Sequence, residues 1–440
     1  MRLLLPLIFI LAPAAAFALD AGFPLPAEYE KRVADGIERY RKSGVVLRVL
    51  DAKGKPVKGA KVEVRQIGHD FLFGCAFPSW DISQKQPNPE TWAKFEEHFL
   101  KLFNYATTEN MLKWPSLEAT EGRMNWAPAD ALVAWAGEHG VTLKGHCLIW
   151  GLESEKWTGY PKWLEGRTPE QVGEKAGAHI REVMVRYKGK IDIWDVVNEP
   201  LHCHWFESHW SPDYVAQSLK WAREANPKAT LIVNEYGGFW GEDKKFVPLC
   251  ERLIRGGAPL GAIGEQAHDP PLIPRPKHVF DLLDHLAGVG KDIHLTEITM
   301  PANGAKIKGD FVQGTWTPET QGKYYRYLFT LAFSHPRVKA ITLWAMWDGS
   351  SWLGEGGIIS RDWTPKPAYR ELDSLINKEW RTNLSGSTEK DGTFRFRGFH
   401  GKYEIRATAG GKTITRRVHL KAGGPRNLGV QFPMGTRPAK

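Results

Sequence analysis

The chain contains the stretch Ile191-Asp192-Ile193-Trp194-Asp195-Val196-Val197-Asn198-Glu199-Pro200, in which five of the first seven residues are apolar. Such a run is typical of a buried parallel strand, because helices cover both faces of a parallel sheet and remove the usual alternation of apolar and polar residues. Pro200 has no backbone N–H for a neighbouring strand, so we expect the strand to end there. Glu199 is therefore predicted at its carboxyl end.

Seven further apolar segments read as strands, and helix-like segments such as 170–187 and 214–225 separate them. The other predicted strands are 71–74, 103–106, 141–150, 230–236, 261–268, 292–297 and 338–347. Eight parallel strands alternating with helices predict an α/β fold, the (β/α)8 TIM barrel. A doubly wound open sheet is less well supported, because no glycine-rich phosphate loop follows any of these strands.

The predicted strand 292–297 also ends in a glutamate, Glu297. The active site of a TIM barrel lies at the carboxyl ends of its strands. Two carboxyl groups there can share the work of glycoside hydrolysis, one giving a proton to the leaving oxygen and the other staying ionised. The alternative is that Glu199 and Glu297 are ordinary charges at loop edges.

The remaining strand ends carry amides, a lysine, histidines and tryptophans, which together suit a sugar. Polar groups bind hydroxyls, and indole rings stack on the C–H faces of sugar rings. The candidate residues are Glu109, Asn110, Lys113, His146, Trp150, Asn198, Gln266, His268, Trp344 and Trp352.

Six motifs follow one another on these strand ends. They are Thr-x-Glu-Asn-x-x-Lys-Trp (107–114), Gly-His-x-Leu-x-Trp (145–150), Trp-Asp-Val-Val-Asn-Glu (194–199), Gly-x-Gln-x-His (264–268), Thr-Glu (296–297) and Trp-x-x-x-Asp-x-x-Ser-Trp (344–352). In this order they resemble glycoside hydrolase family 10, the family of retaining endo-β-1,4-xylanases with a (β/α)8 barrel. The resemblance extends over residues 71–375.

The resemblance implies a role for each residue. Glu199 matches the general acid/base, Glu297 the nucleophile and Asn198 the amide that binds the 2-hydroxyl of the attached sugar. The implied function is a secreted retaining endo-β-1,4-xylanase that needs no metal or organic cofactor. The implied sugar ligands are Glu109, Asn110, Lys113, His146 and Trp150, with Gln266 and His268 flanking the nucleophile and Trp344 and Trp352 walling the glycone subsites.

Three positions depart from the family pattern. Gly151-Leu152-Glu153 stands where the family usually has His-Ser-Gln, Thr299 where it has an aspartate that holds the histidine equivalent to His268, and Glu235 where it has aspartate. Two alternatives therefore stay open: the same machinery acting on another β-linked glycan, and a carbohydrate-binding barrel without turnover. We expect Glu235 to be a hydrogen-bond partner and not a catalyst.

The segment that follows the predicted acid/base contains four potential metal ligands: His202, Cys203, His204 and His209. Their spacing matches no closed zinc pattern, so we predict no metal site and interpret this loop as a lining of the leaving-group subsites. Cys75 and Cys147 lie within strand-like apolar runs, where free buried thiols are expected. We predict no disulfide.

The first 18 residues have the pattern of a signal peptide, with Arg2, the apolar run 3–11 and an Ala-x-Ala cleavage site at 16–18. We therefore expect a secreted or periplasmic protein, and no later apolar run is long enough to span a bilayer. A charged amphipathic helix is predicted within residues 19–43. We expect the protein to bind a polysaccharide substrate and not a nucleic acid, and we expect it to be a monomer.

Residues 44–67 supply two or three predicted strands, and residues 381–434 supply about four more. Because neither set is stable alone, we predict one small β-sandwich assembled from both, with the barrel, 68–380, inserted between them. The two segments resemble the halves of a carboxypeptidase-regulatory-like β-sandwich. The alternative is an N-terminal hairpin on the barrel floor and an independent C-terminal module.

The basic charge of the chain lies in its C-terminal segment. Residues 381–440 hold 13 Lys and Arg against 3 Asp and Glu, a net of +10, whereas the whole chain carries +9. Such a charge favours an anionic polysaccharide or cell-surface polymer. The alternative is a solvated basic face without a partner.

Overall fold

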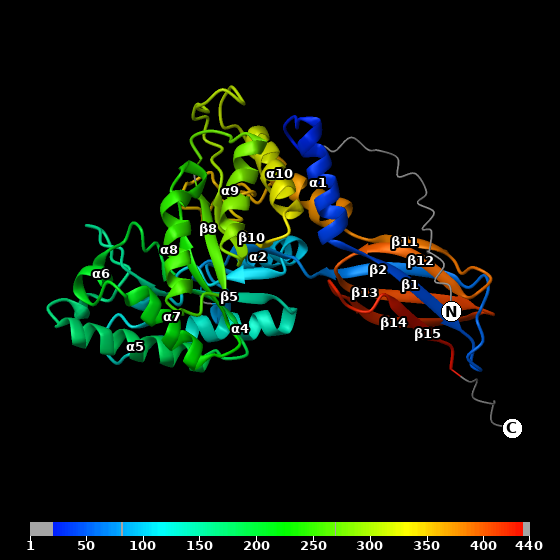
Figure 1. The fold of residues 1–440 in the computed structure, drawn as a ribbon, viewed down its shortest axis with the longest axis horizontal. Helices are drawn as coiled ribbons and strands as arrows, with labels where there is room; N and C mark the ends of the chain where they lie inside the picture. Colours follow the sequence, from blue (N-terminus) through cyan, green and yellow to red (C-terminus); the bar gives the residue numbers. More distant parts are fainter. Residues whose placement is uncertain (1–20, 81, 269, 434–440) are drawn as a thin grey trace.

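The computed structural model describes residues 21–433 except 81 and 269, and it consists of a barrel with a small sandwich at one end (Figure 1). The predicted signal peptide, residues 1–18, lies outside the described residues. In the N-terminal segment the predicted helix is present as α1 (Ala27–Tyr40). It packs along α10 (Pro318–Ser334) of the barrel.

Eight parallel strands close into a barrel in the order β10-β3-β4-β5-β6-β7-β8-β9, which confirms the predicted fold. The strands are β3 (Leu72–Ala76), β4 (Tyr105–Thr107), β5 (Thr142–Trp150), β6 (Ile193–Asn198), β7 (Thr230–Glu235), β8 (Ala262–His268), β9 (Asp292–Thr299) and β10 (Val338–Leu343). Strand β10 was predicted to end at Trp347 but ends at Leu343. The chain turns there, and Trp344 lines a cavity at the carboxyl ends of the strands.

Helices surround the barrel and cover the outer faces of its strands (Figure 1). Helix α5 (Pro169–Arg186) begins at a capping box in which Thr168 and Gln171 each satisfy a backbone N–H of the other. The other α-helices are α2 (Pro89–Leu102), α3 (Trp114–Leu117), α4 (Ala127–His139), α6 (Trp205–His209), α7 (Tyr214–Ala225), α8 (Asp243–Arg255), α9 (Pro276–Gly288) and α11 (Pro367–Ser374).

The sandwich contains strands from both ends of the chain. Its sheets have the orders β12-β1-β15 and β11-β2-β13-β14. The strands are β1 (Lys42–Leu50), β2 (Lys61–His69), β11 (Asn383–Ser387), β12 (Thr393–Phe399), β13 (Gly401–Ala409), β14 (Lys412–Leu420) and β15 (Asn427–Gln431). Each N-terminal strand lies between C-terminal strands, so the shared sandwich is confirmed and the separate hairpin and module are excluded.

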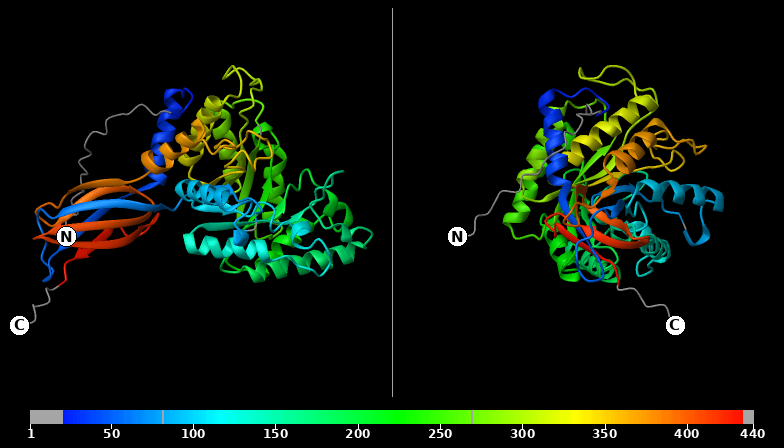
Figure 2. Two further views of the ribbon diagram at one scale, coloured as in Figure 1. Left: turned by 180° about the vertical axis from the view of Figure 1, so that it is seen from behind. Right: turned by 90° about the vertical axis from the view of Figure 1, so that its right-hand side faces the viewer.

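The sandwich has its own core, made by β1 of one sheet and by β2 and β13 of the other. Its buried residues include Val45, Leu47, Val49, Val62, Val64, Tyr403, Ile405 and Ala407. Because β2 ends at His69 and β3 begins at Leu72, the sandwich meets the barrel at the amino ends of the strands. It therefore lies at the end opposite to the carboxyl ends, as Figure 2 also shows.

Deleting residues 381–440 should destabilise the whole chain, because β1 and β2 would lose both neighbours and expose their apolar faces. We expect a lower melting temperature and aggregation, measured by thermal unfolding and light scattering. The control is Arg406→Gln with Arg417→Gln, which removes charge around Glu404 without touching strand pairing. A truncated chain with an unchanged melting temperature and full activity would contradict the prediction.

The four cysteines, Cys75, Cys147, Cys203 and Cys250, are free thiols with buried side chains, as expected for Cys75 and Cys147. Within the described part of the chain, none of the helices combines the length and the apolar character that crossing a membrane requires.

Candidate active site

A cavity of about 620 Å³ lies at the carboxyl ends of the strands, and all twelve predicted site residues line it. Four further residues, Trp157, Tyr236, Gly237 and Trp240, complete the lining. The barrel thus brings together residues from seven strand ends, β4 to β10, that lie up to 243 positions apart, from Glu109 to Trp352. Their individual roles remain predictions.

Glu199 is held at the end of β6 in a strained backbone conformation, with a φ of 54°. Such a left-handed conformation costs a non-glycine residue on the order of 1–3 kcal/mol and persists only when its surroundings enforce it. Here the Glu199 N–H donates to the carbonyl of Asn234 at 2.7 Å. The conformation directs the carboxyl group into the cavity, where Glu199 is one of the lining residues.

Three donors surround the Glu199 carboxyl group. Trp150 Nε1 donates to Oε2 at 2.9 Å, and Gln266 Nε2 donates to Oε1 at 3.0 Å. The Cys203 thiol lies 3.4 Å from Oε2. Because both carboxyl oxygens have a donor, the position of the group is well defined.

Glu297 is buried near the end of β9, where an amide and an imidazole contact its carboxyl group. Asn234 Nδ2 donates to Oε1 at 2.7 Å, and His268 Nε2 lies 3.1 Å from Oε2. Burial alone would raise the pKa of Glu297, but His146, His268 and Lys144 outweigh it and lower the pKa to about 2. Glu297 is therefore ionised at any pH at which the protein is expected to work, as a carboxylate nucleophile must be.

Asn234 connects the two sides of the site, although no sequence motif identified it as a site residue. Its Nδ2 also donates to Asn198 Oδ1 at 2.7 Å, and its Oδ1 accepts a hydrogen bond from Thr296 at 2.6 Å. The amide is thus fixed in one orientation. Its position beside Glu235 at the end of β7 is the signal that could have identified it.

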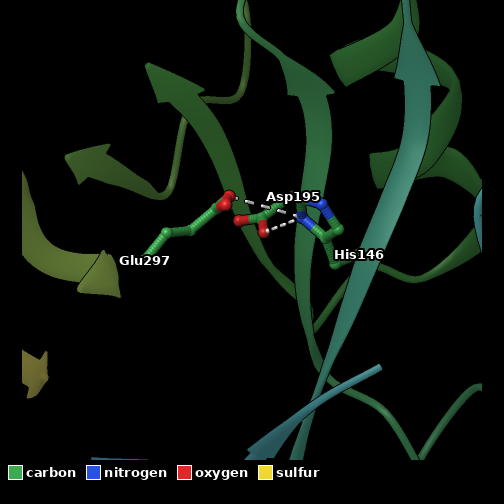
Figure 3. A group of neighbouring side chains, drawn as sticks. All are labelled: His146, Asp195 and Glu297. Atoms are coloured by element: carbon green, nitrogen blue, oxygen red, sulfur yellow. Dashed lines mark hydrogen bonds and ion pairs between the residues drawn. The ribbon is translucent and has the colours of Figure 1, made fainter. Parts of the chain in front are cut away.

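His146, Asp195 and Glu297 lie close together, and His146 approaches both carboxyl groups (Figure 3). Their ligand atoms lie within 4.8 Å of one another, which the sequence did not predict. However, the Lys144 ammonium lies 2.6 Å from the same Asp195 oxygen that His146 Nδ1 approaches at 2.8 Å. Since this buried lysine already supplies positive charge to Asp195, we interpret the group as an ion-pair network and not as a metal centre.

Lys113 lines the cavity among polar and aromatic groups. Its ammonium donates to Asn110 Oδ1 at 2.8 Å and lies 4.6 Å from the ring centre of Trp150 and 5.4 Å from that of Trp157. The cation therefore faces two indole rings. Burial raises the pKa of the neighbouring Glu109 to about 7, because the stabilising charge of Lys113 does not compensate for it and Glu297 adds repulsion.

Glu109→Gln should stabilise the fold at pH 8 but not at pH 4. A carboxyl group whose pKa is raised from 4.5 to about 7 binds its proton more tightly in the folded state, so stability falls as the pH rises through that interval. The gain at pH 8 has an upper limit of about 3 kcal/mol. Thermal unfolding at both pH values measures it. An equal effect of the substitution at pH 4 and pH 8 would contradict the prediction.

The departures at the end of β5 have a structural cause. A Cβ atom at Gly151 would lie 2.5 Å from the carbonyl oxygen of Cys203, so the loop after β6 occupies the space of a side chain. Glu153 lies outside the cavity lining, where its Oε1 accepts a hydrogen bond from Tyr160 at 3.4 Å. Position 151 therefore has no room for a side chain, and Glu153 contacts Tyr160 outside the cavity lining.

Glu235 is a hydrogen-bond partner, as expected. It accepts from the backbone N–H of Leu201 at 2.8 Å and lies 2.7 Å from His202 Nδ1. The other potential metal ligands of this loop point elsewhere, His204 to Glu207 and His209 to the carbonyl of Trp205. None of His202, Cys203, His204 and His209 is among the described residues that line the cavity, but Cys203 contacts Glu199 and His202 stacks on Tyr236. That this loop borders the leaving-group subsites stays a prediction.

Thr299 does contact His268, although it cannot form an ion pair with it. Its hydroxyl lies 3.1 Å from His268 Nδ1 and accepts a hydrogen bond from Trp352 Nε1 at 3.3 Å. A hydroxyl can either donate to a neutral ring or accept from a charged one. Among the described residues, Glu297 is the carboxylate that contacts the His268 ring, at 3.1 Å.

Thr299→Asp should extend activity toward higher pH, because a second carboxylate beside His268 would stabilise the charged imidazole ring. The measurement is kcat/KM as a function of pH for the wild type and the variant. Thr299→Asn is the matched control, since it adds the same bulk without charge. Superimposable profiles of wild type and Thr299→Asp would refute the prediction.

Comparison with known proteins gives one family. The chain matches the model of Glycosyl hydrolase family 10 over residues 64–374. It is 30% identical over 378 residues to the anti-sigma-I factor RsgI6 of Acetivibrio thermocellus, covering 86% of this chain and 46% of that protein. It is 27% identical over 385 residues to endo-1,4-beta-xylanase 1 of Arabidopsis thaliana, covering 86% and 38%. The chain thus spans less than half the length of these two relatives.

A solved structure gives the same result for the fold. The xylanase 10B of Thermotoga petrophila RKU-1 in complex with xylobiose is 26% identical, with a TM-score of 0.60, and the match covers 70% of this chain and 95% of that one. The matched family segment contains every strand of the closed barrel and both glutamates. The chain therefore belongs to glycosyl hydrolase family 10.

Proposed function

We propose that the protein is a retaining endo-1,4-β-xylanase that cleaves internal β-1,4 links of xylan by double displacement. The observation that carries this proposal is the contrast between two carboxyl groups in one cavity. Glu297 is buried and held ionised by His146, His268 and Lys144, whereas Glu199 is half-buried at the end of a different strand. One group is thus suited to attack and the other to proton transfer.

In the first step the Glu297 carboxylate attacks the anomeric carbon, and a covalent bond forms between them. The bond from that carbon to the leaving oxygen breaks, and Glu199 gives this oxygen its proton. Asn198 is positioned by Asn234 beside Glu297, which suits an amide that binds the 2-hydroxyl of the attached sugar.

In the second step Glu199, now ionised, takes a proton from water, and the hydroxide attacks the same carbon. The bond to Glu297 breaks, and the product keeps the configuration of the substrate. The donors on both Glu199 oxygens hold the group in place for both proton transfers.

The test is hydrolysis of a panel of soluble xylans and β-glucans by the full chain, with the first product examined by proton NMR. We expect shortened xylan chains and a β-anomer as first product. An α-anomer would overturn the retaining mechanism. Activity on β-glucans alone would show that the substrate is a β-glucan and not xylan. Binding of xylan without any hydrolysis would favour the carbohydrate-binding barrel.

We also propose that residues 1–18 direct export and that the mature protein is a monomer. The support for export is the sequence pattern of a charged start, an apolar run and Ala16-Phe17-Ala18. N-terminal sequencing of protein recovered from the periplasm or medium tests the cleavage, and light scattering after gel filtration tests the monomer. An uncleaved protein that stays inside the cell would refute export.

A further inference from the structure

The strands that carry the two glutamates divide the rim of the barrel into two arcs. Between β6 and β9, the closed order places β7 and β8 on one side and β10, β3, β4 and β5 on the other. The larger arc carries Lys113, Trp157 and Trp352, and the smaller arc carries Tyr236 and Trp240. A glycan that crosses the pair of glutamates therefore meets aromatic rings on both sides.

Trp240 is exposed, but the turn that carries it is held by contacts with the barrel. It ends the short helix η3 (Gly238–Trp240), which lies between Gly237 and Gly241 with φ values of 87° and 97°. Both glycines are in the left-handed region, so the turn depends on them. Directly before Trp240, the side chain of Phe239 is buried, and its carbonyl accepts a hydrogen bond from His278 Nε2 at 2.7 Å.

A fully buried carboxyl group fastens this turn to the barrel. Glu265 Oε1, on β8, accepts a hydrogen bond from the Gly238 N–H at 3.0 Å. A Cβ atom at position 238 would lie 2.5 Å from Glu265 Oε2, so the two groups are in close contact. Glu265 lies outside the cavity lining, and the reaction proposed above does not use it. We interpret it as a positioning residue for the turn.

The exposure of Trp240 belongs to a pattern. Trp157, Trp240 and Trp352 are the exposed tryptophans of the described chain, at 47%, 41% and 58%, and all three line the cavity. A large apolar ring that stays exposed on a fixed support is typical of a binding surface. An uncharged indole face suits the C–H face of a neutral pyranose ring.

We propose that Trp240 is a stacking platform for a sugar unit on the leaving-group side, beyond the unit beside Tyr236, and that it makes the enzyme prefer long leaving-group chains. This inference rests on the proposed function. The order of the two rings follows from geometry: Tyr236 comes directly after β7, two residues from Asn234, whose carbonyl accepts the Glu199 N–H at 2.7 Å. Trp240 lies four residues further into the loop, so Tyr236 is the ring closer to the acid/base. His202 fixes that ring by stacking on it at 3.9 Å.

Trp240→Ala tests the platform with two substrates. Xylohexaose places several sugars on the leaving-group side, whereas an aryl β-xylobioside ends there with its aryl group. We expect kcat/KM for xylohexaose to fall roughly tenfold, the effect of about 1.4 kcal/mol of lost stacking. The loss for the aryl xylobioside should be much smaller, and Trp240→Phe should recover most of the activity. Trp157→Ala, on the larger arc, is the matched control and should affect both substrates.

Two outcomes would overturn the inference: an unchanged kcat/KM for xylohexaose, or equal losses on both substrates. A wild type that cleaves no xylan would contradict the proposed function instead. In that case calorimetry of Glu297→Gln and of Glu297→Gln with Trp240→Ala measures binding of xylohexaose and cellohexaose directly. Weaker binding by the double variant than by Glu297→Gln supports the platform. Equal affinities of the two variants for each glycan overturn it.

Discussion

Glu297→Ala should abolish hydrolysis of all substrates, with a loss of about 10⁵-fold in kcat, because a covalent mechanism has no first step without its nucleophile. The remaining carboxyl groups in the cavity, Glu109 and Glu199, come from other strands and cannot take its place at the anomeric carbon. The measurement is release of a chromogenic group from an aryl β-xylobioside.

Small anions separate this prediction from simple damage to the fold. Azide should enter the space left by the Glu297 carboxylate and restore part of the activity, and its product should have the inverted configuration. Glu207→Ala, at an exposed position outside the cavity lining, is the matched control and should keep full activity. A Glu297→Ala variant that retains hydrolysis without azide, or a rescued product of retained configuration, would contradict the assignment.

Glu199→Ala should have an effect that depends on the leaving group. A proton donor contributes about 10²–10⁴-fold to the departure of a poor leaving group, such as a sugar oxygen, and little to that of a good one. We therefore expect a large loss of kcat/KM on xylan and a small loss for a dinitrophenyl glycoside. Comparison of the two substrates in steady-state and burst kinetics measures this.

The control for this experiment is Cys203→Ala, which removes one donor to Glu199 but keeps the carboxyl group. It should affect both substrates alike and far less. Equal losses on xylan and on the dinitrophenyl glycoside for Glu199→Ala would exclude Glu199 as the proton donor.

The sequence by itself determined the barrel and the place of the site. Parallel strands covered on both faces leave a local signal, an apolar run such as 191–197 that ends at a polar residue. Because all strands of such a barrel are parallel, their carboxyl ends lie on the same face. The positions of Glu199 and Glu297 at two such strand ends were therefore enough to identify them as candidates. The shared sandwich was also predictable, since two or three strands cannot bury an apolar face alone.

Only the tertiary structure decided the charge states and the loops. The pKa of Glu297 is low despite burial, because His146, His268 and Lys144 on other strands lower it, whereas burial raises the pKa of Glu109. No local pattern records either effect. Trp240 and Trp157 lie in loops without periodicity, so only their exposure at the cavity distinguishes them from core tryptophans. The loss of a side chain at Gly151 is likewise explained only by the approach of Cys203, because a close backbone contact depends on two segments that the sequence does not pair.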